Sequence, residues 1–240
     1  MRPAPGAGST AAEVRAAVLD LADPDRAAGL ARYFQTGPGQ YGEGDTFVGV
    51  MVPGVRGVVR AHRGLGSSEI GVLLDDPVHE VRLAAVLLLV EHSRRAPEEA
   101  LALYLDALHR GRVNNWDLVD LSAKQVIGVA VQHGDRALLD RLAASGSVWE
   151  RRAAVLATFP FLAAGDASTS LELAERLLDD PHPLMHKAVG WMLRETGVRV
   201  GRDVLTGFLD VHAAAMPRVM LSYATEHLDP EQRAHYRALR

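Results

Sequence analysis

The sequence feature that most constrains the fold is an internal repeat. The pentapeptide Leu-Leu-Asp-Asp-Pro occurs at residues 73–77 and returns at residues 177–181, and a similar helical pattern follows each copy. Within these patterns, RLAAVL from Arg82 matches RRAAVL from Arg151, and HKAVGW begins further on at His186. Alanine-rich helices can resemble each other by composition alone, but the doubled pentapeptide argues against that explanation. A period of about 35 residues in paired helices is typical of a solenoid with an extended concave binding surface.

Helix-start signals recur along the chain. A possible cap precedes proline at Asp23-Pro24, Asp76-Pro77, Ala96-Pro97, His182-Pro183 and Asp229-Pro230, and proline suits the first turn of a helix. Apolar residues at helical spacing predict helices near residues 11–22, 25–35, 54–63, 67–75, 78–94, 98–110, 116–132, 135–144, 149–162, 169–179, 184–196, 201–213, 217–227 and 230–239. No alternating strand pattern competes with them. The predicted fold class is therefore all-α, with short connections.

Length and composition add few further limits. The chain has 240 residues, 48% of them hydrophobic, and we expect one domain over residues 10–240 after a frayed tail at residues 1–9. The absence of cysteine excludes disulfides and thiolate chemistry. The tail lacks the apolar segment of a secretion signal, and the longest apolar run, at residues 83–90, is too short to span a bilayer. We therefore expect a cytoplasmic protein that does not enter a membrane.

The positive charges are almost all arginines, although the formal net charge is −4. This balance argues against a protein that coats nucleic acid indiscriminately. Two stretches are nevertheless locally basic: residues 52–63 carry three arginines and no acid, and residues 183–202 carry four cations and one acid. Arginine grips phosphate through a planar fork of donors, so these stretches favour a local basic surface. The alternative is a set of scattered, solvated charges.

A glycine-rich connection covers residues 35–53. Its five glycines could form a phosphate-binding loop, but no strand precedes them and no Gly-Lys-Ser/Thr follows. Glu43 and Asp45 would also repel phosphate. We predict instead an ordered, turn-rich crossover whose glycines meet backbone demands.

The segment VNNWDLVDLSA, residues 113–123, is the first candidate for chemistry. Asn114 and Asn115 are good N-cap residues, so a helix can begin at or just before Trp116. Trp116 and Asp120 are then four residues apart and share one face of the helix. A carboxylate beside an indole, without an obvious local partner, favours a functional site. The alternative is an aspartate that only complements the helix dipole.

Other catalytic motifs are weak or missing. His182 and His186 have metal-ligand spacing, but Pro183 replaces the glutamate of a zincin motif and no third ligand suggests itself. His182 is better interpreted as the start of a helix. The sequence has no Gly-x-Ser-x-Gly elbow, so we do not expect a serine hydrolase. It predicts neither a metal site nor a nucleotide cofactor.

The three tryptophans lie in segments spaced by the repeat: Trp116 in NNWDLVD, Trp149 in VWERRAAV and Trp191 in KAVGWMLRE. They could be core residues, but two lie near arginines, and indoles with arginine suit a sugar-phosphate backbone. Together with GDTFVGVMVP, these segments resemble the AlkD-type DNA alkylation repair glycosylases, which are built from HEAT-like repeats. The resemblance covers nearly the whole chain. It implies an α-α superhelix of HEAT-like repeats with a concave DNA-binding groove.

The resemblance also implies roles for individual residues. Asp120 corresponds to the catalytic carboxylate, and Trp116 and Trp191 correspond to indoles that flank the deoxyribose at the lesion. Arg152 corresponds to an arginine that grips the nearby backbone, which makes it the fourth residue of the catalytic group. Further candidates for DNA contacts are Arg151, Trp149, Lys187, Arg194, Arg56 and Arg60.

The implied activity is that of a monofunctional DNA glycosylase in base excision repair. Such an enzyme hydrolyses the N-glycosidic bond of purines alkylated at N3 or N7 in duplex DNA, and family members do so without flipping the base. The expected partner is duplex DNA with alkylated bases, the expected oligomeric state is a monomer, and no cofactor or metal is implied. Two alternatives stay open: a non-catalytic DNA-binding HEAT-repeat protein and a protein-interaction scaffold.

Overall fold

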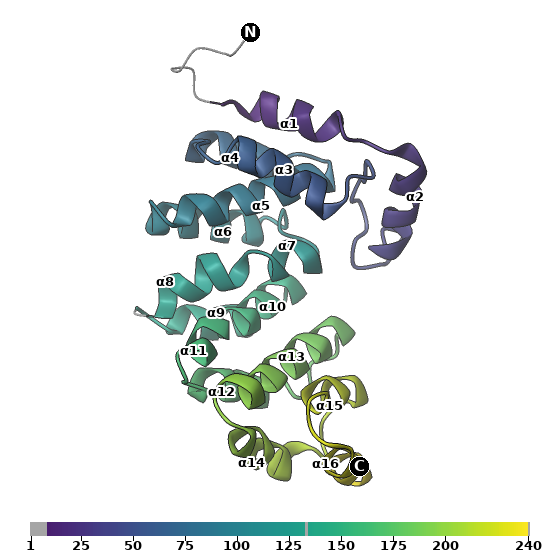
Figure 1. Ribbon diagram of the computed structural model, residues 1–240, viewed down its shortest axis with the longest axis vertical. Helices are drawn as coiled ribbons and strands as arrows, with labels where there is room; N and C mark the ends of the chain where they lie inside the picture. Colours follow the sequence, from purple (N-terminus) through teal and green to yellow (C-terminus); the bar gives the residue numbers. More distant parts are fainter. Residues whose placement is uncertain (1–8, 133, 240) are drawn as a thin grey trace. The chain divides into compact units, whose positions relative to one another are not determined.

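The computed structural model describes residues 9–132 and 134–239. Within these residues the chain is all-α, as predicted, and its only strand-like contact is an isolated bridge between Thr46 and Val78. The chain divides into two compact units, one ending at Ser122 and the other beginning at Ala123 (Figure 1). The predicted tail lies, apart from its last residue, outside the described residues. The single repeat domain over residues 10–240 stays a prediction.

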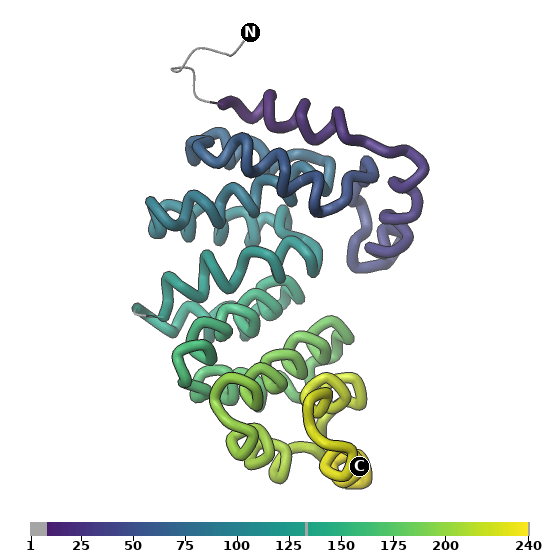
Figure 2. Tube along the Cα trace, viewed as in Figure 1, coloured from purple at the N-terminus to yellow at the C-terminus, as the bar shows by residue number. Residues whose placement is uncertain are grey.

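The first unit is organised around α5. Its helices are α1 (Ala11–Leu19), α2 (Pro24–Tyr33), α3 (Val52–Ala61), α4 (Ser67–Leu74), α5 (His79–Ser93), α6 (Pro97–His109) and α7 (Trp116–Asp120). Figure 2 shows α3, α4, α5 and α6 side by side, and α5 also contacts α1 and α7. Residues 79–89 of α5 are buried without a break. A helix covered on all sides in this way is the core of its unit.

The second unit is organised around α13. Its helices are the π-helix η1 (Lys124–Gly128), α8 (Val129–Gln132), α9 (Ala137–Ala143), α10 (Val148–Leu156), α11 (Phe159–Ala163), α12 (Ser168–Arg176), α13 (Pro183–Arg199), α14 (Arg202–His212), α15 (Arg218–Ala224) and α16 (Pro230–Ala238). α13 packs on α10, α11, α12, α14 and α15. No described helix in either unit has the length and apolarity needed to cross a bilayer.

One set of polar contacts recurs at the repeated segments. Arg82 donates to the carbonyl oxygens six and five residues before it at 2.8 and 3.1 Å, and Arg151 makes the same two contacts at 2.9 and 3.0 Å. His186 donates to the carbonyl oxygen six residues before it at 2.6 Å. The second aspartates of the pentapeptides, Asp76 and Asp180, each accept a hydrogen bond from the backbone N–H two residues further on. These contacts hold the turn before each helix, so the sequence repeat reflects a repeated turn.

Asp76 corrects one predicted helix start. It was expected to cap a helix with Pro77 in its first turn, but α5 begins at His79, with Val78 as its N-cap. The Asp76 carboxylate accepts the Val78 N–H at 2.8 Å instead, within the turn. The predicted caps Asp23, Ala96, His182 and Asp229 are confirmed as N-cap residues.

Two predicted helices are interrupted. The helix expected over residues 116–132 is divided into α7, a turn, η1 and α8. At Gly128, the end of η1, an added Cβ would lie 2.6 Å from the carbonyl oxygen of Ala157, so the backbone is tightly packed there. The helix expected over residues 149–162 divides into α10 and α11, because Pro160 starts a new helix.

The glycine-rich connection is an ordered crossover, as predicted. Gly49 has φ +89, and an added Cβ there would lie 2.0 Å from the carbonyl oxygen of Asp23. The Glu80 carboxylate accepts the backbone N–H groups of Val48, Gly49 and Val50 at 2.8–3.2 Å. A buried anion surrounded by backbone donors is well satisfied. The connection is therefore fixed against both α2 and α5.

Candidate functional site

The helix that carries the candidate carboxylate, α7, begins as the sequence predicts. Asn115 has an extended backbone, and its side-chain oxygen accepts the N–H of Trp116 at 2.9 Å. The helix ends at Asp120 after five residues. A helix this short has little stability of its own. Its orientation in the unit therefore depends on side-chain contacts.

A row of stacked rings supports Trp116. The indole stacks on Phe34 at a centroid distance of 5.1 Å and an interplanar angle of 19°. Phe34 stacks on Phe47 at 4.9 Å, and Phe47 stacks on the imidazole of His79 at 4.4 Å. Tyr33 meets the indole edge-on at 6.0 Å. Each aromatic pair contributes about 0.5–1.5 kcal/mol beyond its buried area, so this row fixes the plane of the indole.

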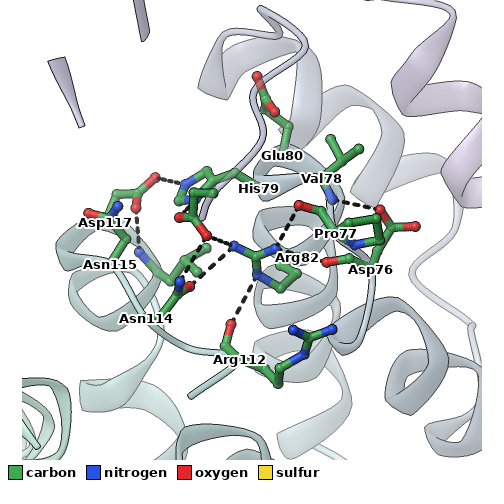
Figure 3. A network of polar contacts seen from close by, with 12 residues as sticks. Asp76, Pro77, Val78, His79, Glu80, Arg82, Arg112, Asn114, Asn115 and Asp117 are labelled. Carbon is green, nitrogen blue, oxygen red and sulfur yellow. Dashed lines mark hydrogen bonds and ion pairs between the residues drawn. The ribbon is translucent and has the colours of Figure 1, made fainter. Parts of the chain in front are cut away.

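At the far end of this row, His79 bridges two carboxylates (Figure 3). Its Nδ1 lies 3.0 Å from Asp45 Oδ2 and its Nε2 lies 2.9 Å from Asp117 Oδ2. Burial alone would lower the pKa of His79, but the hydrogen bonds to Asp117 and Asp45 outweigh it and raise the pKa to about 9. The ring is therefore an imidazolium at neutral pH, and both of its nitrogens donate.

Arg82 completes this buried network. Its Nη2 donates to Asp45 Oδ1 at 2.5 Å and to Asn114 Oδ1 at 3.2 Å, and Asn114 Nδ2 donates to the same Asp45 oxygen at 2.8 Å (Figure 3). Its Nε donates to the carbonyl oxygen of Arg112 at 3.1 Å. Burial would raise the pKa of Asp45, but the contacts with His79, Arg82 and Asn114 lower it. The segment that leads into α7 is thus tied to the glycine-rich connection.

A small pocket opens beside the ring row. It has a volume of about 180 Å³ and apolar walls. The lining residues come from α2, the connection, α3, α5 and α7, and they include Leu30, Tyr33, Phe34, Phe47, Met51, Leu83 and Trp116. His79, Glu80 and Asp117 also line it, but their polar atoms already make hydrogen bonds within the protein. His79 bonds to Asp117, and Glu80 accepts from the backbone of the connection. The pocket therefore offers shape and apolar surface rather than hydrogen bonds.

The two carboxylates of α7 have different surroundings. Asp117 is buried, and its second oxygen, Oδ1, accepts the N–H of Leu118 at 2.9 Å. Asp120 is only partly buried. Burial and the nearby Asp120 charge both raise the pKa of the Tyr104 phenol, against a hydrogen bond from Ser122 that lowers it. Asp117 thus serves the internal network, and Asp120 is the carboxylate of α7 that keeps contact with solvent.

The predicted residues of α10 lie largely inside the second unit. Trp149 and Arg152 are buried, with 8% and 4% of their surfaces exposed, and Arg152 Nη1 donates to the carbonyl oxygen of Leu184 on α13 at 2.5 Å. Arg151 donates from Nε to Asp180 Oδ2 at 2.6 Å, in addition to the turn carbonyls described above. These contacts show structural roles for the three side chains. Their predicted contacts with DNA stay predictions.

The predicted residues of α13 are more accessible. Lys187 is exposed, and Trp191 is partly buried, with its indole N–H donating to Glu195 Oε1 at 3.1 Å. Arg194 pairs with Glu195 and with Glu226. Burial would raise the pKa of Glu195, but hydrogen bonds from Arg199 and Trp191, and the charges of Arg199 and Arg194, lower it. Trp191 is therefore held by an anion at its edge.

The remaining predicted DNA contacts, Arg56 and Arg60, lie on α3 and are exposed. They are four residues apart, so they share one face of the helix. In the described part of the chain, no group of three or more histidine, aspartate or glutamate side chains is placed to hold a metal ion.

Comparison with known proteins identifies the family. A family model described as DNA alkylation repair enzyme matches residues 14–228. The chain belongs to the DNA alkylation repair enzyme family. A solved structure described as a predicted DNA alkylation repair enzyme from Enterococcus faecalis is similar in fold, with a TM-score of 0.69, 16% identity, and coverage of 87% of this chain and 97% of that chain. At that identity the likeness shows the fold alone. No curated protein matches the chain.

Membership of the DNA alkylation repair enzyme family supports a role in the repair of alkylated DNA, and it implies a DNA substrate. Within the first unit, the structure places the predicted pair Trp116 and Asp120 on one short helix. Within the second unit, it brings Arg152 of α10 against α13, the helix that carries Trp191. The catalytic and DNA-binding roles of these residues stay predictions.

The buried residues that contact α7 through its Asp117 were not predicted from the sequence. Among the histidines only His182 and His186 were considered, and Asp45 was considered only as a charge that repels phosphate. A signal was present: Asp45 lies 34 residues before His79, and Asp117 lies 38 residues after it. Residues about one repeat apart in a stack of helical repeats lie side by side. This spacing could have predicted that the three side chains meet.

Proposed function

We propose that this chain is a monofunctional DNA glycosylase that hydrolyses the N-glycosidic bond of cationic purines alkylated at N3 or N7 in duplex DNA. The observation that carries the proposal is the difference in burial between the two carboxylates of α7. Asp117 is buried and bonded to His79, whereas Asp120 is partly accessible and lies one helical turn from the partly buried indole of Trp116. Membership of the DNA alkylation repair enzyme family supports the role in repair of alkylated DNA on which this proposal builds.

The chemistry matches these side chains. A purine alkylated at N3 or N7 carries a positive charge, so its bond to C1′ breaks with the electron pair leaving on the base, and no general acid is needed. Positive charge then develops on the sugar. A carboxylate about 4 Å from it, at an effective dielectric near 20, contributes roughly 4 kcal/mol, or about three decades in rate. Water adds to C1′ and loses a proton, and Asp120 can orient this water.

The indoles have a matching role. An indole face attracts a cation with about 1–2 kcal/mol when water is excluded. We assign Trp116 to the deoxyribose at the lesion, and Trp191 to the same class of contact. Arg152, Arg56, Arg60 and Lys187 are assigned to the phosphates, which supply most of the affinity of proteins for DNA.

We propose further that the base is not read in a pocket. Enzymes that flip a base recognise it by hydrogen bonds to its edge and by stacking. The pocket beside Trp116 has apolar walls, and the polar atoms of His79 and Glu80, which also line it, already make hydrogen bonds within the protein. Such a pocket cannot read the edge of a purine. Lesions of different size should therefore be excised, and selectivity for one small lesion in a panel would contradict this part of the proposal.

The direct test is release of free base. The protein is incubated with duplex DNA that contains N7-methylguanine or N3-methyladenine, and the free alkylpurine and the abasic strand are quantified against a no-enzyme control. We expect free alkylpurine and an abasic strand that is not cleaved. Binding of DNA without release would indicate a non-catalytic DNA-binding protein, and neither binding nor release would indicate a scaffold.

A further inference from the structure

The buried side chain of His79 meets two buried carboxylates from other parts of the first unit. Asp45 comes from the glycine-rich connection and Asp117 from α7, and their oxygens lie 3.0 and 2.9 Å from the two ring nitrogens. The side chains are 1%, 3% and 7% exposed for His79, Asp45 and Asp117. Both contacts can be donated only when both nitrogens carry a proton. The bridge is therefore a cation held between two anions.

The bridge acts on the helix that carries the candidate site. Asp117 is the second residue of α7, directly after Trp116 and three residues before Asp120. Because α7 has only five residues, fixing Asp117 also fixes the directions of the Trp116 and Asp120 side chains on the same helix. The same imidazole also ends the ring row, through Phe47 and Phe34, that supports the face of Trp116.

The charged groups that face His79 come from each element packed around it. Asp45 lies on the connection and Asp117 on α7, and on α5 itself Glu80 and Arg82 lie one and three residues further on. Glu80 is directed to the backbone of the connection, and Arg82 shares Asp45 with the imidazole. Burying such charges is expensive, and an apolar core of similar volume is often at least as stable. Stability alone therefore does not explain the arrangement.

We propose that His79 is a positioning residue for the repair site: by bridging Asp45 and Asp117 it fixes α7 against the connection, and so orients Trp116 and Asp120. This inference rests on the proposed function for its effect on base release, but its effect on Trp116 can be measured without catalysis. His79 touches neither DNA nor the reacting atoms in this account.

The first experiment follows Trp116 directly. In the full chain carrying Trp149→Phe and Trp191→Phe, Trp116 is the remaining tryptophan, and its emission is recorded from pH 6 to 10. A transition with a midpoint near pH 9 is expected, because the pKa of His79 is raised to about 9 by its two carboxylates. Adding His79→Gln should remove this transition. Emission that does not respond to pH or to His79→Gln would overturn the proposal.

The second experiment measures single-turnover release of N7-methylguanine in the natural background over the same pH range, with uncatalysed release subtracted and the fold followed by circular dichroism. His79→Gln should slow release at pH 7 by tenfold or more, with the Kd for undamaged duplex unchanged within twofold. The rate of release should fall at alkaline pH as His79 loses its proton. Asp117→Asn should move this fall to lower pH, because one of the two carboxylates that retain the proton on His79 is gone. His92→Gln is the matched control, since His92 lies on the same helix and pairs with a single carboxylate, Glu99, at 2.8 Å.

The outcomes separate the two proposals. Base release by His79→Gln with the rate and pH profile of the natural chain would overturn the positioning role. Absence of release from every variant, with the Trp116 transition still present, would contradict the glycosylase proposal and support the positioning of Trp116. If His79→Gln does not fold, the pH dependence of base release by Asp117→Asn tests the positioning role instead. An alkaline fall in rate at the same pH as in the natural chain would overturn the inference.

Discussion

Asp117 and Asp120 stand three residues apart on α7 and meet different surroundings. Asp117 is buried against the His79 imidazolium, whereas Asp120 is partly accessible. A carboxylate that neutralises an internal cation cannot also approach a sugar. The candidate for chemistry is therefore Asp120, and this assignment comes from its exposure rather than from residue type.

At the same scale, His79 links folding to pH. Its folded pKa of about 9 lies above the ordinary value of 6.5, so its contribution is fully present below pH 6.5 and is lost as pH rises through about 9. The free energy of unfolding, measured by urea titration, should fall across this interval by up to about 3 kcal/mol. His79→Gln should remove most of that slope and His92→Gln should keep it. A level free energy of unfolding in the natural chain from pH 6.5 to 9.5 would contradict the charged bridge.

At the scale of elements, the start of α7 could be predicted and its end could not. Asn115 caps the helix through its own side chain, so a local pattern suffices to place Trp116 at the first position. The change from η1 to α8 coincides with the tight packing of Gly128, the last residue of η1, against the Ala157 carbonyl, which lies far along the sequence. Periodicity carries no information about such a contact.

The residues around α7 show the same limit. Trp116 and Asp120 could be found because they are close in sequence and belong to a recognisable segment. Phe34 stacks on the indole and Phe47 stacks on Phe34 because of the path that the chain takes into and through the connection, which no local pattern specifies. The bridge of Asp45, His79 and Asp117 was within reach of the repeat spacing, but only if each repeat is aligned residue by residue.

The glycine-rich connection gives a prediction at this scale. Gly49→Ala should destabilise the protein by more than about 2 kcal/mol, because the new Cβ would lie 2.0 Å from the Asp23 carbonyl oxygen at φ +89. Gly29→Ala is the matched change. It lies within α2 with nothing within 4 Å of the added Cβ, so alanine should be neutral or stabilising by up to about 1 kcal/mol. Thermal and urea unfolding check both, and equal effects would show that the connection is not tightly fixed.

At the scale of the whole molecule, charge is the property that bears on DNA. The net charge is −4, and several arginines, including Arg15, Arg82 and Arg151, pair with buried carboxylates. Affinity for DNA must therefore come from local cations rather than from the total. The repeat was visible in the sequence, whereas the division at Ser122 and Ala123 has no signal in composition, because it depends on how helices pack.

The exposed arginines of α3 provide the corresponding test. If Arg56 and Arg60 each contact a phosphate, Arg56→Ala combined with Arg60→Ala should weaken binding to any duplex sequence. The combined change should lower the slope of log K against log salt by about 2. Fluorescence anisotropy with a labelled duplex from low to moderate salt measures this slope, and Arg94→Ala, an exposed arginine paired with Glu91, is the control. An unchanged slope would remove α3 from the DNA-binding surface.

The central claim is that the Asp120 carboxylate stabilises positive charge on the sugar as the alkylated base leaves. The measurement that tests it most directly is the single-turnover rate of N7-methylguanine release by Asp120→Asn, with enzyme in excess and DNA binding followed in parallel. The account predicts a rate about a thousandfold below that of the natural chain, with the Kd for the duplex unchanged within about twofold. An Asp120→Asn protein that releases the base at the natural rate would contradict the account.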